Sequence, residues 1–325
     1  MNVSRWMRQI QDLIPGLLLL LAGAAAGCQR ELPPDVTRTN GVVVAERRPS
    51  SGALALPNTR GSVKFAIIGD SGRGDQAQHD VAEQMVTWRA QFPFDLVLML
   101  GDNIYDRHTP DDYVAKFEVP YKALLDAGVT FRAAIGNHDD PAQIHYEKFN
   151  MGGQRYYSFR RVEVSLEGIT GAGVRFFALD SRSLDAEQLD WLQTSLAESS
   201  SRWKIVFLHH PIYTSGRYAT AARSLRLSLE PVLVDGDADV VLAGHEHFYE
   251  RLRPQRGILY FVSGAAGSLR RGDIRETDLT ARGYDTDYSF MLMEISGDEA
   301  YFQVISRAGV TVDAGVITKG RGRQP

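Results

Sequence analysis

The chain has 325 residues, of which 36 are basic and 40 acidic, so its formal net charge is −4. With 44% hydrophobic and 23% charged residues, its composition is that of a globular protein and excludes a disordered or collagen-like chain. The lack of a basic excess argues against a protein that binds nucleic acid through its phosphates. The single cysteine excludes an internal disulfide and a cysteine-rich zinc module, so any metal must be held by His, Asp, Asn or Tyr.

The first 28 residues are typical of a processing signal that is not part of the fold. Arg5 and Arg8 give a positive start, and the apolar run over residues 14–26 is shorter than the ~20 residues that span a bilayer. Small residues lead to the only cysteine, Cys28, in a stretch that resembles a bacterial lipoprotein signal, in which the cysteine becomes lipidated. The resemblance implies an exported protein, anchored to the membrane of the bacterial envelope through Cys28 and facing the periplasm. The alternative is plain secretion, with a soluble periplasmic or secreted product.

The rest of the chain divides into a linker, one folded domain and a short tail. Prolines and Ser-Gly turns interrupt any periodicity in residues 29–61, which predicts a flexible linker. Regular patterns occupy residues 62–318, where we expect the folded domain, and residues 319–325 form the tail. Residues 41–45 have strand character, but no neighbouring pattern supports a strand there.

Five short apolar runs predict strands, because they are rich in β-branched or aromatic residues and end at polar groups. They cover residues 63–68, 94–100, 129–135, 204–208 and 238–243. Four runs stop at a glycine followed at once by a polar residue: Gly69-Asp70, Gly101-Asp102, Gly136-Asn137 and Gly244-His245. The remaining run ends at His209-His210-Pro211. We expect the glycines to permit a sharp turn with positive φ.

Helical patterns lie between these runs, over residues 77–89 and 185–197, the second with Asp185 as its predicted cap. Alternating strands and helices indicate α/β layering, and such sheets bind ligands at the carboxyl ends of their strands. The C-terminal runs at residues 259–262, 289–295 and 301–306 are joined by short turns and predict a second, more antiparallel sheet.

The polar groups at the five strand ends form one ordered set. Its members are Gly-Asp, Gly-Asp-Asn-Ile-Tyr, Gly-Asn-His-Asp, His-His-Pro and Gly-His-Glu-His. Any one of them alone fits a turn residue or a surface histidine, but the set in this order resembles the calcineurin-like metallophosphoesterase superfamily. The resemblance implies an α+β fold, a four-layer α/β/β/α sandwich. Two mixed sheets would be flanked by helices, with a metal site at the strand carboxyl ends.

Two compensating departures point to one branch of this superfamily. Most members have Asp-x-His in the first motif, whereas Asp70-Ser71-Gly72 lacks that histidine. Tyr105 follows Asp102 by three residues, a pattern that resembles purple acid phosphatases of the tartrate-resistant type, in which this tyrosine binds ferric iron. A phenolate is a hard anionic donor and suits a trivalent cation. The alternative for Tyr105 is a packed aromatic residue beside a strand end.

The resemblance implies a binuclear metal centre of Fe(III) with a divalent ion, which would be Fe, Zn or Mn. The first metal would be held by Asp70, Asp102, Tyr105 and His247. The second would be held by Asp102, Asn137, His209 and His245, with Asp102 as the bridge. His138 would bind the phosphate and protonate the leaving alkoxide, with Asp139 orienting its ring. We expect His210 near the centre without a metal bond.

A further departure concerns substrate binding. Beyond the His-x-Pro motif, where this family often has a histidine, the chain has Tyr218, preceded by Arg217. Arg217 could bind phosphate bidentately and Tyr218 could donate a hydrogen bond to the substrate. The alternative for both is an exposed loop.

The resemblance therefore implies a phosphoric ester hydrolase that acts on a small-molecule phosphomonoester through a water activated at the metal centre. A phosphodiesterase or nucleotidase on the same centre is the alternative, because leaving-group choice lies in the rim loops. A second alternative is a non-catalytic, surface-anchored binding module. Such a module would be expected to have lost some metal ligands, whereas the full predicted set is present here.

Overall fold

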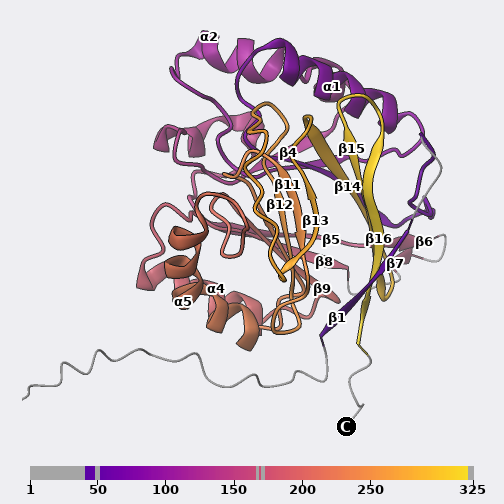
Figure 1. Cartoon of the computed structure of the whole chain (residues 1–325), viewed down its shortest axis with the longest axis vertical. Coiled ribbons are helices and arrows are strands. Elements are labelled where there is room, and N and C mark those ends of the chain that lie inside the picture. Colours follow the sequence, from indigo (N-terminus) through magenta and orange to yellow (C-terminus); the bar gives the residue numbers. More distant parts are fainter. Residues whose placement is uncertain (1–40, 48–51, 166–167, 170–172, 321–325) are drawn as a thin grey trace, which may run out of the picture. The chain divides into compact units, whose positions relative to one another are not determined.

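The computed structural model describes residues 41–47, 52–165, 168–169 and 173–320, so the predicted signal and Cys28 lie outside the described residues. The described part builds two seven-stranded sheets, A and B, with helices on their outer sides (Figure 1). This confirms the predicted α+β sandwich of two mixed sheets. Within the described residues, no helix combines the length and apolar character needed to cross a membrane.

Sheet A contains the first three predicted strands together with two of the three predicted C-terminal strands, those at residues 289–295 and 301–306. Its order is β1 (Val42–Glu46), β16 (Thr311–Lys319), β15 (Glu299–Ser306), β14 (Ser289–Ser296), β2 (Val63–Ile68), β3 (Leu96–Met99) and β4 (Thr130–Ala133). The strands β2, β3 and β4 run parallel, and all other pairs are antiparallel.

Sheet B contains the last two predicted site strands. Its order is β13 (Thr280–Tyr284), β11 (Tyr249–Leu252), β12 (Leu259–Ser263), β10 (Val240–Ala243), β9 (Trp203–Leu208), β8 (Val174–Ala178) and β5 (Tyr157–Arg161). Strands β8, β9, β10 and β12 are parallel. A separate hairpin joins β6 (Val164–Ser165) to β7 (Gly168–Ile169).

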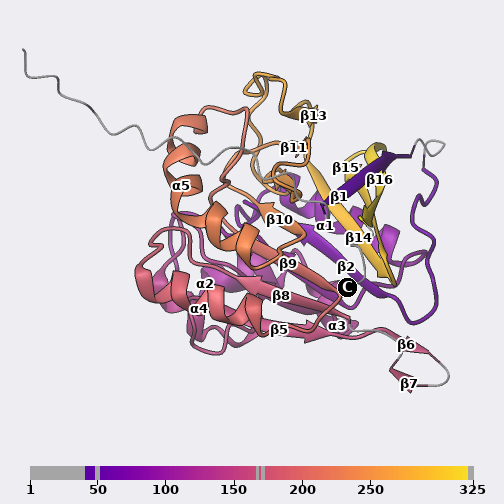
Figure 2. The same ribbon diagram turned by 90° about the horizontal axis from the view of Figure 1, so that it is seen from below.

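Alternating side chains of sheet B face two different cores, as the two-residue period of a strand requires. Phe176, Ile205 and Phe207 face sheet A, where the Phe176 ring meets Phe65 edge to face at 5.2 Å. The residues between them, such as Val206, pack instead in a second core with α4 (Ala186–Ala197) and α5 (Ala219–Asp235). Figure 2 shows these two helices on the side of sheet B away from β14, β15 and β16.

The outer face of sheet A is covered by three helices and several short helical turns. These are α1 (Gln76–Arg89), α2 (Pro110–Tyr113), α3 (Lys122–Asp126), a π-helical turn at Val114–Glu118 and 3₁₀ turns at Pro141–His145 and Glu147–Phe149. The two predicted helices correspond to α1 and α4. Asp185 caps α4 as expected, since its side chain accepts a hydrogen bond from the Gln188 backbone N–H at 2.9 Å.

Two sequence expectations about the organisation of the chain were wrong. Residues 42–46, assigned to a flexible linker, form β1, which pairs antiparallel with β16, and Leu56 from the same predicted linker is buried in the core. The C-terminal strands do not make a separate antiparallel sheet. Instead β14 pairs with β2, and β12 lies parallel to β10 in sheet B. Both errors arise because strand partners lie far away in the sequence.

Candidate metal centre

The first predicted ligand set converges at the carboxyl ends of β2 and β3. The Tyr105 hydroxyl donates a hydrogen bond to Asp70 Oδ1 at 3.2 Å and lies 3.2 Å from His247 Nε2. His247 Nε2 is in turn 3.3 Å from Asp70 Oδ1. Tyr105 is 1% exposed, so it is buried, but its hydroxyl points into the cluster and not into an apolar core. The position of the hydroxyl therefore fits the predicted ligand role better than a tyrosine that is only packed.

The second predicted set converges at the ends of β4, β9 and β10. His209 Nδ1 donates to the Leu100 carbonyl at 2.9 Å, which leaves the lone pair of Nε2 for the site. That Nε2 lies 3.0 Å from Asn137 Oδ1 and 3.2 Å from His245 Nδ1. An amide oxygen and an imidazole lone pair cannot hydrogen-bond to each other, so a cation shared by both atoms would relieve their contact.

Asp102 stands between the two sets. A carboxylate oxygen of Asp102 lies within 4.8 Å of a carboxylate oxygen of Asp70 and of a ring nitrogen of His247, and Asp102 Oδ1 is 3.4 Å from His209 Nε2. The His138 backbone N–H donates to Asp102 Oδ1 at 2.9 Å, which fixes the carboxylate. The carboxylate can therefore face both clusters at once.

Backbone strain coincides with these residues. Asp70, Asp102 and His245 have φ of 56°, 51° and 68°, a left-handed conformation that costs a residue with a side chain ~1–3 kcal/mol. The expectation that the preceding glycines supply positive φ holds for Gly101, at 87°. It is wrong for Gly69, Gly136 and Gly244, which have no positive φ. Gly136 instead permits a close approach, because a Cβ there would lie 2.2 Å from the Asp102 backbone nitrogen.

The electrostatics of the clusters fit bound cations. Burial, followed by the Asp102 carboxylate, raises the pKa of Asp70 well above its ordinary value. Burial lowers the pKa of His245 to about 2 and that of His247 to about 3, so both imidazoles are neutral and have a lone pair to donate. The clusters therefore offer carboxylate oxygens and neutral imidazole nitrogens, which are donor atoms that metal ions bind.

His138 and Asp139 do not form the expected pair, in which the carboxylate would orient the imidazole ring. The His138 side chain is exposed, with its ring centroid 4.8 Å from that of Tyr105. Asp139 is buried and accepts hydrogen bonds from the backbone of Asn103, Ile104 and Gly136. The expected orientation of His138 by Asp139 is therefore wrong: Asp139 instead ties the loop after β3 to the loop after β4.

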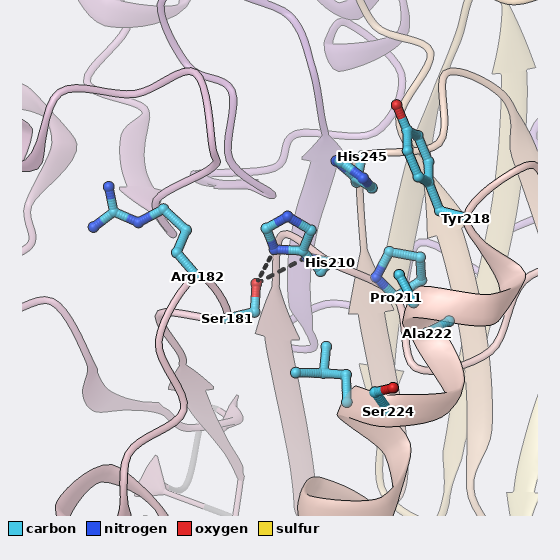
Figure 3. A pocket seen from close by; sticks show the side chains of 10 residues that line it. Ser181, Arg182, His210, Pro211, Tyr218, Ala222, Ser224 and His245 are labelled. Carbon is cyan, nitrogen blue, oxygen red and sulfur yellow. Dashed lines mark hydrogen bonds between the residues drawn. The ribbon is translucent and has the colours of Figure 1, made fainter. Parts of the chain in front are cut away.

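The two predicted substrate residues lie beside the centre, with different contacts. The Arg217 guanidinium makes a bidentate ion pair with Asp273, with Nε 2.8 Å from Oδ2 and Nη2 3.0 Å from Oδ1. The ring of Tyr218 lies 4.3 Å from that of His245 (Figure 3), and the Arg270 guanidinium carbon lies over the Tyr218 ring, 5.5 Å from its centroid. Tyr218 is thus placed to contact a substrate, whereas the bidentate face of Arg217 is already taken by a carboxylate.

Sequence reasoning missed several residues that shape the site. Arg73 stacks on the Tyr105 ring, with its guanidinium carbon 3.7 Å from the ring centroid. Ser181 bonds His210 Nδ1 at 2.9 Å, and His210 joins His209 and His245 in one histidine cluster. The carboxylate of buried Glu246 accepts a hydrogen bond from the Tyr218 backbone N–H at 2.9 Å. Only Glu246 had a sequence signal, because it lies between two predicted ligands.

The described residues form a two-sheet sandwich with two clusters of potential metal ligands at its strand ends, an arrangement expected of a metallophosphoesterase. A family model for calcineurin-like phosphoesterases matches residues 63–249, and the chain belongs to this family. Purple acid phosphatase 17 of Arabidopsis thaliana is 26% identical over 254 residues, which cover 68% of this chain and 73% of that protein. Human tartrate-resistant acid phosphatase type 5 is 24% identical over 303 residues, which cover 79% and 92%.

A solved structure supports the same fold. The purple acid phosphatase from yellow lupin seeds superposes with a TM-score of 0.61 at 16% identity, covering 80% of this chain and 54% of that one. The chain is therefore a calcineurin-like phosphoesterase, a phosphoric ester hydrolase, and its sequence is similar to purple acid phosphatases. Phosphoester hydrolysis at a two-metal centre is the activity that its family and its clusters support.

Proposed function

We propose that the protein hydrolyses phosphomonoesters at a binuclear Fe(III)–M(II) centre, with Fe, Zn or Mn as the divalent ion. The observation that carries this proposal is the position of the Tyr105 hydroxyl, 3.2 Å from both Asp70 Oδ1 and His247 Nε2. Three donors that include a phenol oxygen and a carboxylate suit a hard trivalent cation. The purple acid phosphatases among the relatives support the same choice.

The proposed ligands follow the two clusters. Asp70, Asp102, Tyr105 and His247 hold the trivalent ion, and Asp102, Asn137, His209 and His245 hold the divalent one. When bound, the cations supply Lewis-acid activation of a water and neutralise charge on the phosphoryl oxygens. The Leu100 carbonyl keeps the proton of His209 on Nδ1, and the His138 backbone N–H holds the Asp102 carboxylate in place.

His138 is the proposed proton donor to the leaving oxygen. Its ring is exposed and stands on the face of Tyr105, while its backbone N–H is bonded to Asp102. The side chain therefore lies at the solvent-facing rim of the clusters, where it could reach the leaving oxygen of a bound ester. A positioned acid of this kind contributes ~10²–10⁴-fold to the rate.

The proposed precursor has a signal over residues 1–28, followed by a tether that ends before Val42. Since β1 belongs to sheet A and β16 runs to Lys319, the catalytic domain extends beyond the predicted bounds of 62–318 at both ends. Lipidation of Cys28 would hold the domain on a membrane of the envelope. The alternative, release into the periplasm or medium, is tested by membrane fractionation.

The deciding experiment measures substrate and metals on one sample. Protein purified without its signal is assayed with 4-nitrophenyl phosphate and bis(4-nitrophenyl) phosphate, and its metals are quantified. We expect about two metals per chain with iron as one of them, faster turnover of the monoester, and loss of activity with a chelator. Preference for the diester would support the phosphodiesterase alternative, and metal-loaded protein without either activity would contradict a phosphatase.

A further inference from the structure

A cavity of about 290 Å³ opens beside the candidate metal centre, on the side of His210 and His245 (Figure 3). Ser181 and Arg182, which follow β8, form one wall, and Pro211 and Tyr218 with the first turns of α5 form the other. His245 is a proposed metal ligand, so the cavity is continuous with the place where the phosphoryl group would lie. No residue of α5 was singled out by the sequence.

The cavity walls nearest the centre are held in place before any ligand arrives. Ser181 Oγ lies 2.9 Å from His210 Nδ1 and also accepts the His210 backbone N–H at 2.9 Å. On the opposite wall, the Glu246 carboxylate fixes the backbone of Tyr218 at 2.9 Å. Gly216 permits this contact, because a Cβ there would lie 2.4 Å from Glu246 Oε1. Three aromatic rings, from His210, Tyr218 and His245, are therefore pre-positioned.

The rest of the cavity is mostly apolar. Its lower wall consists of Pro211, Ala222 and Leu225, with the uncharged hydroxyl of Ser224 beside them. Arg182 is the one charged lining residue among those described, and its guanidinium pairs with both oxygens of Asp180 at 2.9 and 3.0 Å. In Figure 3 that guanidinium points away from His210 and Tyr218. A charged substituent in the cavity would lose its hydration without gaining a partner.

We infer that this cavity binds the alcohol half of the substrate and that this half is a flat, uncharged ring system. The inference rests on the proposed function, which puts the phosphoryl group at the metal centre. A cavity of ~150 Å³ holds benzene, so 290 Å³ accommodates one or two rings. Offset stacking on the Tyr218 and His210 rings stabilises an aromatic group beyond its buried area.

The test compares phosphonates that differ only in their organic half. Calorimetry on metal-loaded protein measures the affinity of inorganic phosphate, methylphosphonate and phenylphosphonate. Burial of a phenyl ring should make phenylphosphonate bind ~10- to 50-fold more tightly than methylphosphonate. Ala221 is exposed and lines the cavity, so Ala221→Phe should fill it, abolish this preference and leave phosphate binding unchanged. Ala219→Phe, at an exposed position of α5 outside the lining, should keep the preference.

Two results would overturn the inference. One is equal affinity for the phenyl and methyl compounds; the other is an Ala221→Phe variant that weakens both to the same extent. Adenosine monophosphate is a second probe. If it binds more tightly than phenylphosphonate and loses affinity in Ala221→Phe, the cavity holds a base that is linked to the phosphate through a sugar. Failure to bind inorganic phosphate at all would instead refute the proposed function, on which the inference depends.

Discussion

Replacing Tyr105 with phenylalanine tests the assignment of the first metal site most directly. The substitution removes only the hydroxyl, since the ring stays packed between Arg73, at 3.7 Å, and His138, at 4.8 Å. It deletes a donor to buried Asp70 and one proposed ligand of the trivalent ion. A hydrogen bond or ligand contact to a charged group is worth ~1.5–3 kcal/mol, so the first cation should bind about 10- to 150-fold more weakly.

The assay combines visible absorption, metal content and turnover of 4-nitrophenyl phosphate. We expect the wild type to be coloured by charge transfer from the Tyr105 phenolate to iron and Tyr105→Phe to be colourless, with part of its activity retained. Tyr157→Phe is the matched control, because this buried tyrosine loses one hydrogen bond, to the Ala133 carbonyl at 2.8 Å, and is outside the cluster. A wild type that is colourless and fully active with zinc or manganese alone would refute the reasoning.

Three further substitutions test separate parts of the proposal. His138→Ala should lower kcat by ~10²–10⁴-fold with unchanged metal content, and loss of one metal would make His138 a ligand instead. Cys28→Ser should move the protein from the membrane to the soluble fraction without changing turnover; a wild type that is already soluble contradicts lipidation. Gly136→Ala should prevent metal loading, because its Cβ would lie 2.2 Å from Asp102 Oδ1. Gly128→Ala is its control: a Cβ at Gly128 would meet open space, so the substitution should only cost ~1 kcal/mol of stability, through the φ of 75° at this position.

The sequence was informative about the site because each motif is local. A strand that ends at a polar residue places that residue at the sheet edge wherever the strand lies, so Asp70 and His245 could be predicted without knowing that β2 and β10 lie in different sheets. The same limitation explains the failures. The contact of His210 with Ser181 joins residues 29 positions apart, and the β1–β16 pair joins the two ends of the fold.

Helix α5 is the clearest omission. Its apolar residues Leu229 and Leu233 follow a helical spacing, but Pro231 interrupts the pattern and argues against a continuous helix. The helix persists because Leu229 and Leu233 are fully buried against sheet B. Tertiary packing thus outweighed the local signal in the element that lines the cavity next to the metal centre.

The protons released on metal binding give the last prediction. Burial, followed by Asp70 and Asp102, raises the pKa of Tyr105, so its hydroxyl is protonated in the metal-free protein at neutral pH. A phenolate ligand must lose that proton, whereas His245 and His247, with pKa values of about 2 and 3, are already neutral and release none. Affinity for a trivalent ion should therefore rise with pH.

Tyr105→Phe should release about one proton fewer per chain than the wild type. Asp70 releases a proton in both proteins because its pKa is raised, and loss of the Tyr105 hydrogen bond raises it further in the variant, so the difference between them is a lower bound on the Tyr105 proton. The measurement is a pH-stat titration of metal-free protein with gallium(III) nitrilotriacetate, corrected by a blank titration, since gallium is trivalent and does not change oxidation state. Equal proton release by the two proteins would mean that the phenol oxygen is not a ligand, whatever the colour of the iron form.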